Sequence, residues 1–103
     1  MDERLNRLDE PHMRPLMGLV EGMRARGHSV PNPDPNDGGV NAHVLALLES
    51  PGPKAVVSDF ISRDNNDESA RNIGAALDHA GLGRDDVMLW NVVPWALGEA
   101  YKD

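Results

Sequence analysis

Polar side chains follow two apolar segments of this 103-residue sequence, at the points where those segments end. Residues 44–48 (Val-Leu-Ala-Leu-Leu) run into Glu49 and Ser50, and residues 87–90 (Val-Met-Leu-Trp) run into Asn91. An asparagine amide can offer one donor and one acceptor to the edge of a ligand. The sequence therefore predicts half of an active site at these two segment ends. Three further polar residues are candidates for it: Asp59, Asp64 and Asn65.

Strands are the elements that must position these side chains. The run at residues 44–48 is short and continuous without polar alternation, which is typical of a strand buried on both faces in a parallel sheet covered by helices. In such sheets, ligands bind beyond the carboxyl ends of the strands. The turn at residues 49–53 contains two prolines and a glycine, and the turn at residues 91–95 contains one proline. Both turns are expected at that end of the sheet.

Two helices are predicted around the strands. Residues 11–26 carry apolar side chains at spacings of three and four, and Gly27 follows as a stop signal. The second helix opens within residues 64–69, where Asn65 and Glu68 have the spacing of a capping box. Its buried stripe is predicted at Ala70, Ile73, Leu77 and Ala80.

The segment between the first strand and the second helix, residues 54–63, is predicted to be irregular, with a short extended piece at 55–57. Residues 43–91 then form a βαβ unit. The predicted fold class is α/β, with parallel strands and flanking helices.

Residues 29–39 are predicted to form a loop, stiffened by three prolines and ended by two glycines. Asp34, Asn36 and Asp37 suggest calcium, but the oxygen ligands lack the alternate spacing and the closing glutamate of an EF-hand. We therefore expect no metal here. The functional alternative is that this loop walls the site next to Glu49.

Each candidate site residue also has a purely structural interpretation. Asn91 can be a turn-capping asparagine, and Phe60 can be a core residue. Ser50 has the hydroxyl of a nucleophile, but no G-x-S-x-G turn surrounds it.

Composition narrows the class of protein. An apolar content of 40% suits one small domain, and a net charge of −7 argues against a general nucleic-acid binder. An acidic solvated surface is the simplest interpretation of the charge, and a DNA mimic or a binder of basic proteins is the alternative.

The sequence has no cysteine, which excludes thiolate zinc sites and iron–sulfur clusters and fits a reducing cytoplasm. No apolar run approaches the roughly 20 residues of a membrane span, so no membrane association is expected.

No cofactor is expected either. The sequence has no P-loop and no G-x-G-x-x-G, so nucleotide-cofactor binding has no support. The four histidines share no spacing that is typical of metal ligands.

Four motifs in order resemble those of the uracil-DNA glycosylase superfamily, specifically a bacterial branch of uracil-DNA glycosylase-like proteins. They are residues 31–39 (Pro-Asn-Pro-Asp-Pro-Asn-Asp-Gly-Gly), 48–53 (Leu-Glu-Ser-Pro-Gly-Pro), 60–72 (Phe-Ile-Ser-Arg-Asp-Asn-Asn-Asp, then Ser-Ala-Arg-Asn) and 90–95 (Trp-Asn-Val-Val-Pro-Trp). Each motif is weak alone, and the ordered set is fairly specific.

The resemblance implies an α/β/α sandwich around a four-stranded parallel sheet. It also implies hydrolysis of the N-glycosidic bond of a uracil flipped out of DNA, the first step of base excision repair. Such enzymes read an extruded base by edge hydrogen bonds and stacking.

Site residues follow from the resemblance by position. The first catalytic loop, which lies beside the uracil and its sugar, corresponds to Glu49, Ser50, Pro51 and Gly52. Phe60 resembles the aromatic residue that stacks on the base, and Asn91 resembles the asparagine that reads the uracil edge. Ser50 stands where some branches have aspartate or asparagine, which leaves Glu49 or a backbone group as alternatives for positioning the attacking water.

The sequence also departs from the family. The family continues with two more strands and a His-Pro-Ser-Pro-like loop whose histidine stabilises the leaving uracil, and no histidine here lies in such a motif. The expectation is a single truncated domain over residues 1–103, with an N-terminal helical region (1–29) and a family-like core (30–98). It would resemble half of the sandwich.

These expectations lead to two main hypotheses. The first is a glycosylase-like protein that binds uracil-containing DNA and is inactive or incomplete as an enzyme by itself. The second is a non-catalytic remnant or interaction module that forms a homo-oligomer, or pairs with a complementing chain, through an open sheet edge.

Overall fold

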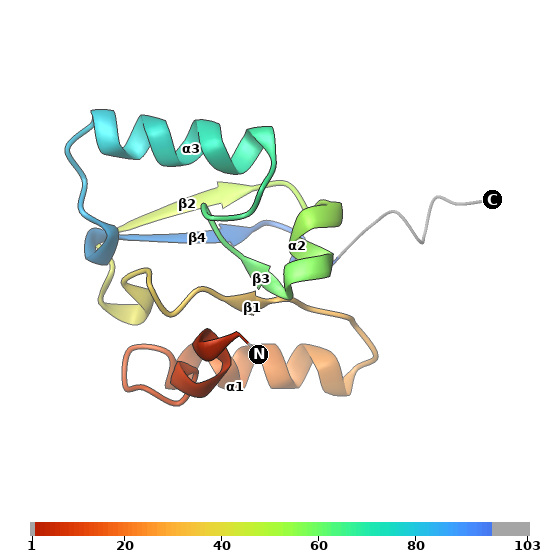
Figure 1. The fold of residues 1–103 in the computed structure, drawn as a ribbon. Helices are drawn as coiled ribbons and strands as arrows, with labels where there is room; N and C mark the ends of the chain where they lie inside the picture. Colours follow the sequence, from red (N-terminus) through yellow and green to blue (C-terminus); the bar gives the residue numbers. More distant parts are fainter. Residues whose placement is uncertain (1, 96–103) are drawn as a thin grey trace.

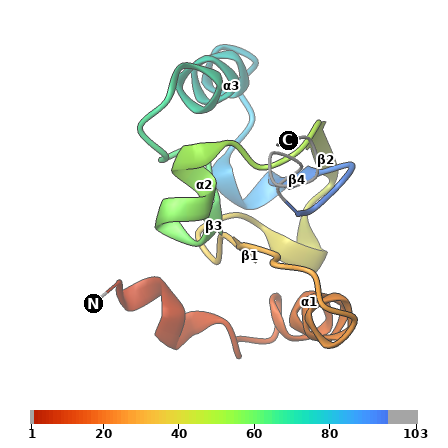
Figure 2. The same ribbon diagram turned by 90° about the vertical axis from the view of Figure 1, so that its right-hand side faces the viewer.

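The computed structural model describes residues 2–95 and has two pairs of strands between helices (Figures 1 and 2). The helices are α1 (Arg14–Ala25), α2 (Pro53–Ser58) and α3 (Glu68–His79), with short 3-10 helices η1 (Glu3–Arg7), η2 (Gly39–Asn41) and η3 (Arg84–Asp86). The strands are β1 (Asn32–Pro33), β2 (Val44–Leu48), β3 (Phe60–Ile61) and β4 (Val87–Asn91). In Figure 2, α3 lies on one side of the strands and α1 with η1 on the other. The predicted α/β class is confirmed.

The longer strand pair joins β2 and β4 in parallel, with Val44 opposite Val87 and Leu48 opposite Asn91. Parallel neighbours need a crossover, and here the connection runs through α2, β3 and α3. The main core cluster lies between this pair and α3, and its buried members are Ile61, Leu77, Val87 and Leu89. The two predicted strands and their parallel pairing are therefore confirmed.

The prediction that β2 is buried on both faces is wrong. Leu45 and Leu47 are 56% and 53% exposed, whereas Ala46 and Leu48 on the opposite face pack against the core cluster. Successive side chains of a strand point to opposite faces. Within residues 2–95, α3 covers one face of β2, and no helix covers the other enough to bury these leucines.

Most of residues 54–63 are in regular elements, contrary to prediction. Helix α2 occupies the stretch that includes the expected extended piece at 55–57, and β3 follows it. Pro53 stands in the first helical turn, where its missing N–H costs no hydrogen bond. Ala55 is buried while Val57 is exposed, so burial of one helix face overrides the strand preference of the valines. Asp59, with φ of 67°, ends the helix in the left-handed region.

The other boundaries shift by a few residues. Helix α1 begins at Arg14, because residues 11–13 form a turn after Glu10. Helix α3 begins after Asp67, whose carboxylate accepts a hydrogen bond from the Ala70 amide at 2.7 Å, so the capping residue is Asp67 and not Asn65.

The expected apolar stripe of α3 is mostly confirmed. Ala70 and Leu77 are buried and Ile73 is partly buried, while Ala80 is exposed. None of the helices within residues 2–95 is long and apolar enough to cross a membrane.

The predicted loop at residues 29–39 is largely buried and contains β1, which pairs with β3 in parallel. Its two glycines are required by close packing. A Cβ atom on Gly38 would lie 2.0 Å from the carbonyl oxygen of Asp85, and Gly39 has a φ of +56°.

Candidate functional site

A cavity of about 290 Å³ opens at the carboxyl ends of β2 and β4. It is bounded by the turn after β2, the end of β4, and the segment that leads from β3 into α3. Five of the six site residues expected from the sequence line it: Glu49, Ser50, Pro51, Gly52 and Asn91. The expectation that both turns lie at one end of a parallel strand pair is therefore confirmed.

Backbone hydrogen bonds hold the two turns together beyond the strands. The Val92 amide donates to the Leu48 carbonyl at 2.8 Å, and the Val93 amide donates to the Glu49 carbonyl at 3.0 Å. Continued pairing fixes the distance between the turn at residues 49–52 and Asn91. The cavity thus stands on the rigid end of the sheet rather than on a free loop.

Asn91 is the most enclosed polar side chain of the cavity. It is the last residue of β4 and only 3% exposed. Asn91 takes part in no side-chain hydrogen bond within residues 2–95, whereas the side chains of Asn32 and Asp34 are bonded there. Among the described residues, the fully buried side-chain atoms without any partner are Nε and Nη2 of Arg63. An asparagine amide at a cavity wall offers both a donor and an acceptor that the edge of a ligand can pair with. The turn-capping interpretation of Asn91 has no such bond to support it.

The turn after β2 forms the rim of the cavity. Pro51 is buried and Glu49 is exposed. Gly52 is extended, with ψ of 179°, and its carbonyl accepts from the amides of Ala55 and Val56 at 3.1 Å as α2 begins. The turn is therefore anchored at both ends, by β4 and by α2.

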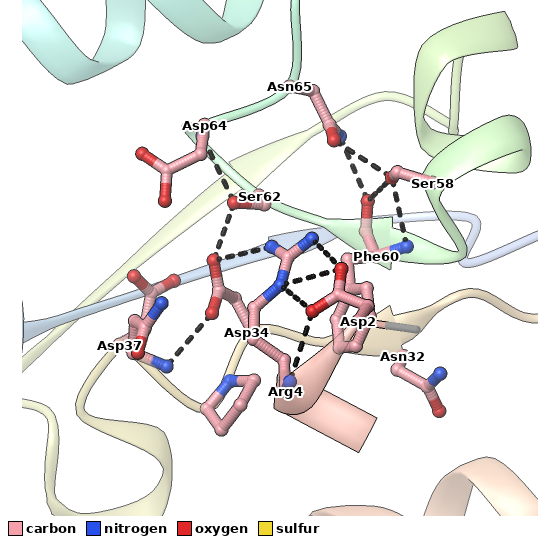
Figure 3. Close-up of polar contacts among 12 residues, drawn as sticks. Asp2, Arg4, Asn32, Asp34, Asp37, Ser58, Phe60, Ser62, Asp64 and Asn65 are labelled. Carbon is pink, nitrogen blue, oxygen red and sulfur yellow. Dashed lines mark hydrogen bonds and ion pairs between the residues drawn. The ribbon is translucent and has the colours of Figure 1, made fainter. Parts of the chain in front are cut away.

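Asn65 and the first turn of α3 close the opposite side of the cavity. The Asn65 amide nitrogen donates to the Phe60 carbonyl at 2.9 Å, and its oxygen accepts from Ser58 Oγ at 2.8 Å (Figure 3). Asp67 caps the helix and Ser69 lies at the lining. Of the three further candidates from the sequence, Asn65 lines the cavity, whereas Asp59 and Asp64 do not.

Phe60 does not line the cavity. It is fully buried, and the Arg4 guanidinium lies 4.0 Å from its ring centroid. The adjacent residue of β3, Ile61, faces the cavity instead, because neighbouring side chains of a strand point to opposite sides. The structure thus places Phe60 in the core, as its structural interpretation expected, and leaves no aromatic side chain among the described residues of the lining.

A buried ionic network behind the cavity was missed at the level of sequence. The fully buried Asp34 carboxylate accepts from Ser62 Oγ and lies 3.5 Å from Arg4 (Figure 3). It also accepts from Arg84 at 2.9 Å. Arg84 also pairs with Asp64 at 2.9 Å. Ser62 lines the cavity, so the network supports one of its walls. The sequence signal was a pair of aspartates, Asp34 and Asp37, in a proline-rich segment, a pattern that is also typical of solvated loops.

Asp37 belongs to the same network, and its surroundings disfavour the charged form of its carboxyl group. Burial, followed by the nearby charge of Asp34, raises the pKa of Asp37 to about 6. Hydrogen bonds from the Leu89 amide and from Arg84, each 3.2 Å long, act in the opposite direction. Asp37 thereby ties the loop to the side of β4 that faces away from β2.

The prediction that residues 29–39 wall the site next to Glu49 is wrong. None of them lines the cavity, and they lie along β4, where Gly38 donates to the Val87 carbonyl at 3.0 Å. Within residues 2–95, no group of three or more His, Asp or Glu side chains is arranged to hold a metal ion.

Comparisons of the chain with protein-family models, with curated proteins and with solved structures found no match.

Proposed function

We propose that the cavity binds a single pyrimidine base extruded from DNA, and that the chain is a uracil-DNA glycosylase-like protein of base excision repair. The observation that carries this proposal is the enclosed side chain of Asn91, which lines the cavity at the end of β4 and makes no side-chain hydrogen bond within residues 2–95. Its oxygen can accept the N3–H of uracil while its nitrogen donates to the neighbouring carbonyl oxygen. The motif order seen in the sequence supports the same base.

The size of the cavity supports a small ligand. At about 290 Å³, it stands at the low end of ligand pockets, which begin on the order of 300 Å³. A single base fits this scale better than a dinucleotide cofactor does.

The lining also bears on the chemistry. In N-glycosidic hydrolysis, water adds to the anomeric carbon as the C–N bond breaks, and the base leaves with the bonding electron pair. Glu49 or Ser50 at the rim can orient the water. Departure of an anionic base requires donors or positive charge near it. No Arg, Lys or His is among the described residues of the lining, and Glu49 and Asp67 are acidic. We therefore expect this chain to recognise uracil well and to release it slowly by itself.

The test is binding of a single-stranded oligonucleotide that contains one uracil, followed by isothermal titration calorimetry and compared with the thymine oligonucleotide. Asn91→Ala should weaken binding of the uracil oligonucleotide by about tenfold or more, because both edge hydrogen bonds are lost. Asn72→Ala, which removes an exposed asparagine of α3, is the matched control and should bind as the parent does.

Equal affinity of the parent and Asn91→Ala would contradict the proposal. Uracil release from the same oligonucleotide should be measured alongside binding. If the parent releases uracil fast and Asn91→Ala does not, Asn91 remains assigned to uracil recognition. The residues that line the cavity would then be sufficient for cleavage of the glycosidic bond.

A further inference from the structure

The outer edge of β2 is open. Within residues 2–95, β2 pairs only with β4, and its other edge has no strand partner. Backbone hydrogen bonds show which residues of each strand face the other strand. On β2, the Leu48 carbonyl faces β4, because it accepts from the Val92 amide. On β4, the Val87 carbonyl and the Leu89 amide face away from β2, because they bond to Gly38 and Asp37 in the loop after β1. This alternation directs the backbone groups of Val44, Ala46 and Leu48 toward β4. The backbone groups of Leu45 and Leu47 consequently face the open edge.

The side chains at this edge are apolar. Leu45 and Leu47 are more than half exposed on one face, and Val44 is 37% exposed. No residue between Val44 and Leu48 is charged, so nothing on the strand blocks another strand from pairing. The two flanking residues are polar and exposed, with His43 before the strand, 3.7 Å from Asp86, and Glu49 after it.

The order of residues 43–49 (His-Val-Leu-Ala-Leu-Leu-Glu) is self-complementary about Ala46. If a second copy pairs antiparallel with Ala46 opposite Ala46, then Leu45 faces Leu47 of the other copy and His43 faces its Glu49. Leu45 and Leu47 are the residues whose backbone groups point outward, so they can exchange N–H···O bonds as a hydrogen-bonded pair. A shift of two residues in either direction keeps that alternation but separates His43 from Glu49.

We propose that a second copy of this chain pairs with β2 in antiparallel orientation centred on Ala46, which makes a symmetric dimer with a continuous β4–β2–β2–β4 sheet. A twofold axis through the Ala46 pair makes each contact occur twice, as a closed dimer requires. The leucines of the two copies meet across the strands, where such pairs stabilise sheets. The contact area of one strand pair is small, so the dimer is weak and concentration-dependent.

The pairing has a consequence for the cavity. Glu49 lines its rim, so His43 of the second copy comes to lie beside that rim. Dimer formation does not depend on the proposed binding of uracil, and it can be tested without DNA.

The experiment is sedimentation velocity over a range of protein concentrations, with charge variants that report the register. His43→Glu places two glutamates opposite each other at both ends of the strand pair, and it should raise the dimer Kd about tenfold. The double variant His43→Glu with Glu49→Lys restores opposite charges and should return the Kd toward that of the parent. His79→Glu makes the same charge change on exposed α3 and should leave the Kd unchanged.

Leu45→Pro provides a second test, because it removes an N–H that faces the open edge and not β4. This variant should stay monomeric while keeping the circular dichroism spectrum of the parent. A parent that is monomeric at every concentration would overturn the proposal. A dimer that persists unchanged in both Leu45→Pro and His43→Glu would overturn it as well, since the interface would then lie elsewhere.

Discussion

At the scale of single residues, two buried polar side chains have different roles: Asn91 lines the cavity, and Asp34 lies outside it. Asn91 is buried and makes no side-chain hydrogen bond within residues 2–95, whereas Asp34 is buried with Arg84, Ser62 and the Asn36 amide around it. A satisfied group contributes to a unique packed structure, and an amide at a cavity wall offers a donor and an acceptor to a ligand. This difference is why Asn91 is assigned to recognition and Asp34 to the scaffold.

Asp37 should make the stability of the fold depend on pH. Its pKa is about 6 in the folded protein and near 3.9 in an unfolded chain. Between these values the folded state holds the proton and the unfolded state has lost it, so stability falls as pH rises from about 4 to 6. The loss is on the order of 2–3 kcal/mol.

The measurement is urea unfolding of the parent and Asp37→Asn across this pH range. The asparagine keeps an acceptor for the Leu89 amide but does not titrate, so its stability should fall less between pH 4 and 6. Asp85→Asn, at an exposed position, is the control and should follow the parent. Parallel curves for the parent and Asp37→Asn would show that Asp37 does not titrate in this window.

At the scale of elements, α3 carries one wall of the cavity, and its position depends on its first turn. Ser69 and Ala70 line the cavity, and Asp67 fixes the start of the helix through the Ala70 amide. Asp67, which caps α3, therefore also fixes the position of the cavity wall that this helix forms. The start of α2 also has two roles, because its first amides hydrogen-bond to Gly52 and so hold the turn at residues 49–52.

Asp67→Ala should destabilise the fold by about 1 kcal/mol, because it removes the side-chain acceptor of the helix N-terminus. Asp67→Asn, which can still cap, should lose much less. Thermal unfolding followed by circular dichroism distinguishes the two variants. An equal loss in both would mean that the carboxylate charge, and not the cap, is what stabilises α3.

At the scale of the whole molecule, Arg84 connects segments that are far apart in the sequence. Its guanidinium pairs with Asp34 and Asp37 in the loop after β1, and with Asp64 between β3 and α3. The residue itself lies in η3, directly before β4. One side chain thus joins the two strand pairs on the side of β4 away from β2.

Arg84→Met should cost about 3–5 kcal/mol of unfolding free energy, because Asp34 and Asp37 remain buried without their main cation. Arg71→Met is the matched control: Arg71 is exposed and bonds only Asn66 through its side chain within the described residues. Its loss should be below about 0.5 kcal/mol. Urea unfolding gives the loss in unfolding free energy for both variants. A small loss in Arg84→Met would indicate that Arg4 pairs with the buried carboxylates or that water solvates them.

The sequence alone determined the α/β class, the β2–β4 strand pair and the meeting of Glu49, Ser50, Pro51, Gly52 and Asn91 at one edge. These features follow from local patterns, since apolar runs set the strands and parallel strands bring their carboxyl ends together.

Tertiary structure alone decided which face of each element is covered. Phe60 and Ile61 are neighbours in a two-residue strand and both are buried, and only packing against Arg4 and α3 decides that Ile61, and not Phe60, lines the cavity. The same holds for the exposed leucines of β2 and for the pairing of Arg84 with Asp34. Burial and charge pairing depend on contacts between distant segments, and a local sequence pattern does not encode those contacts.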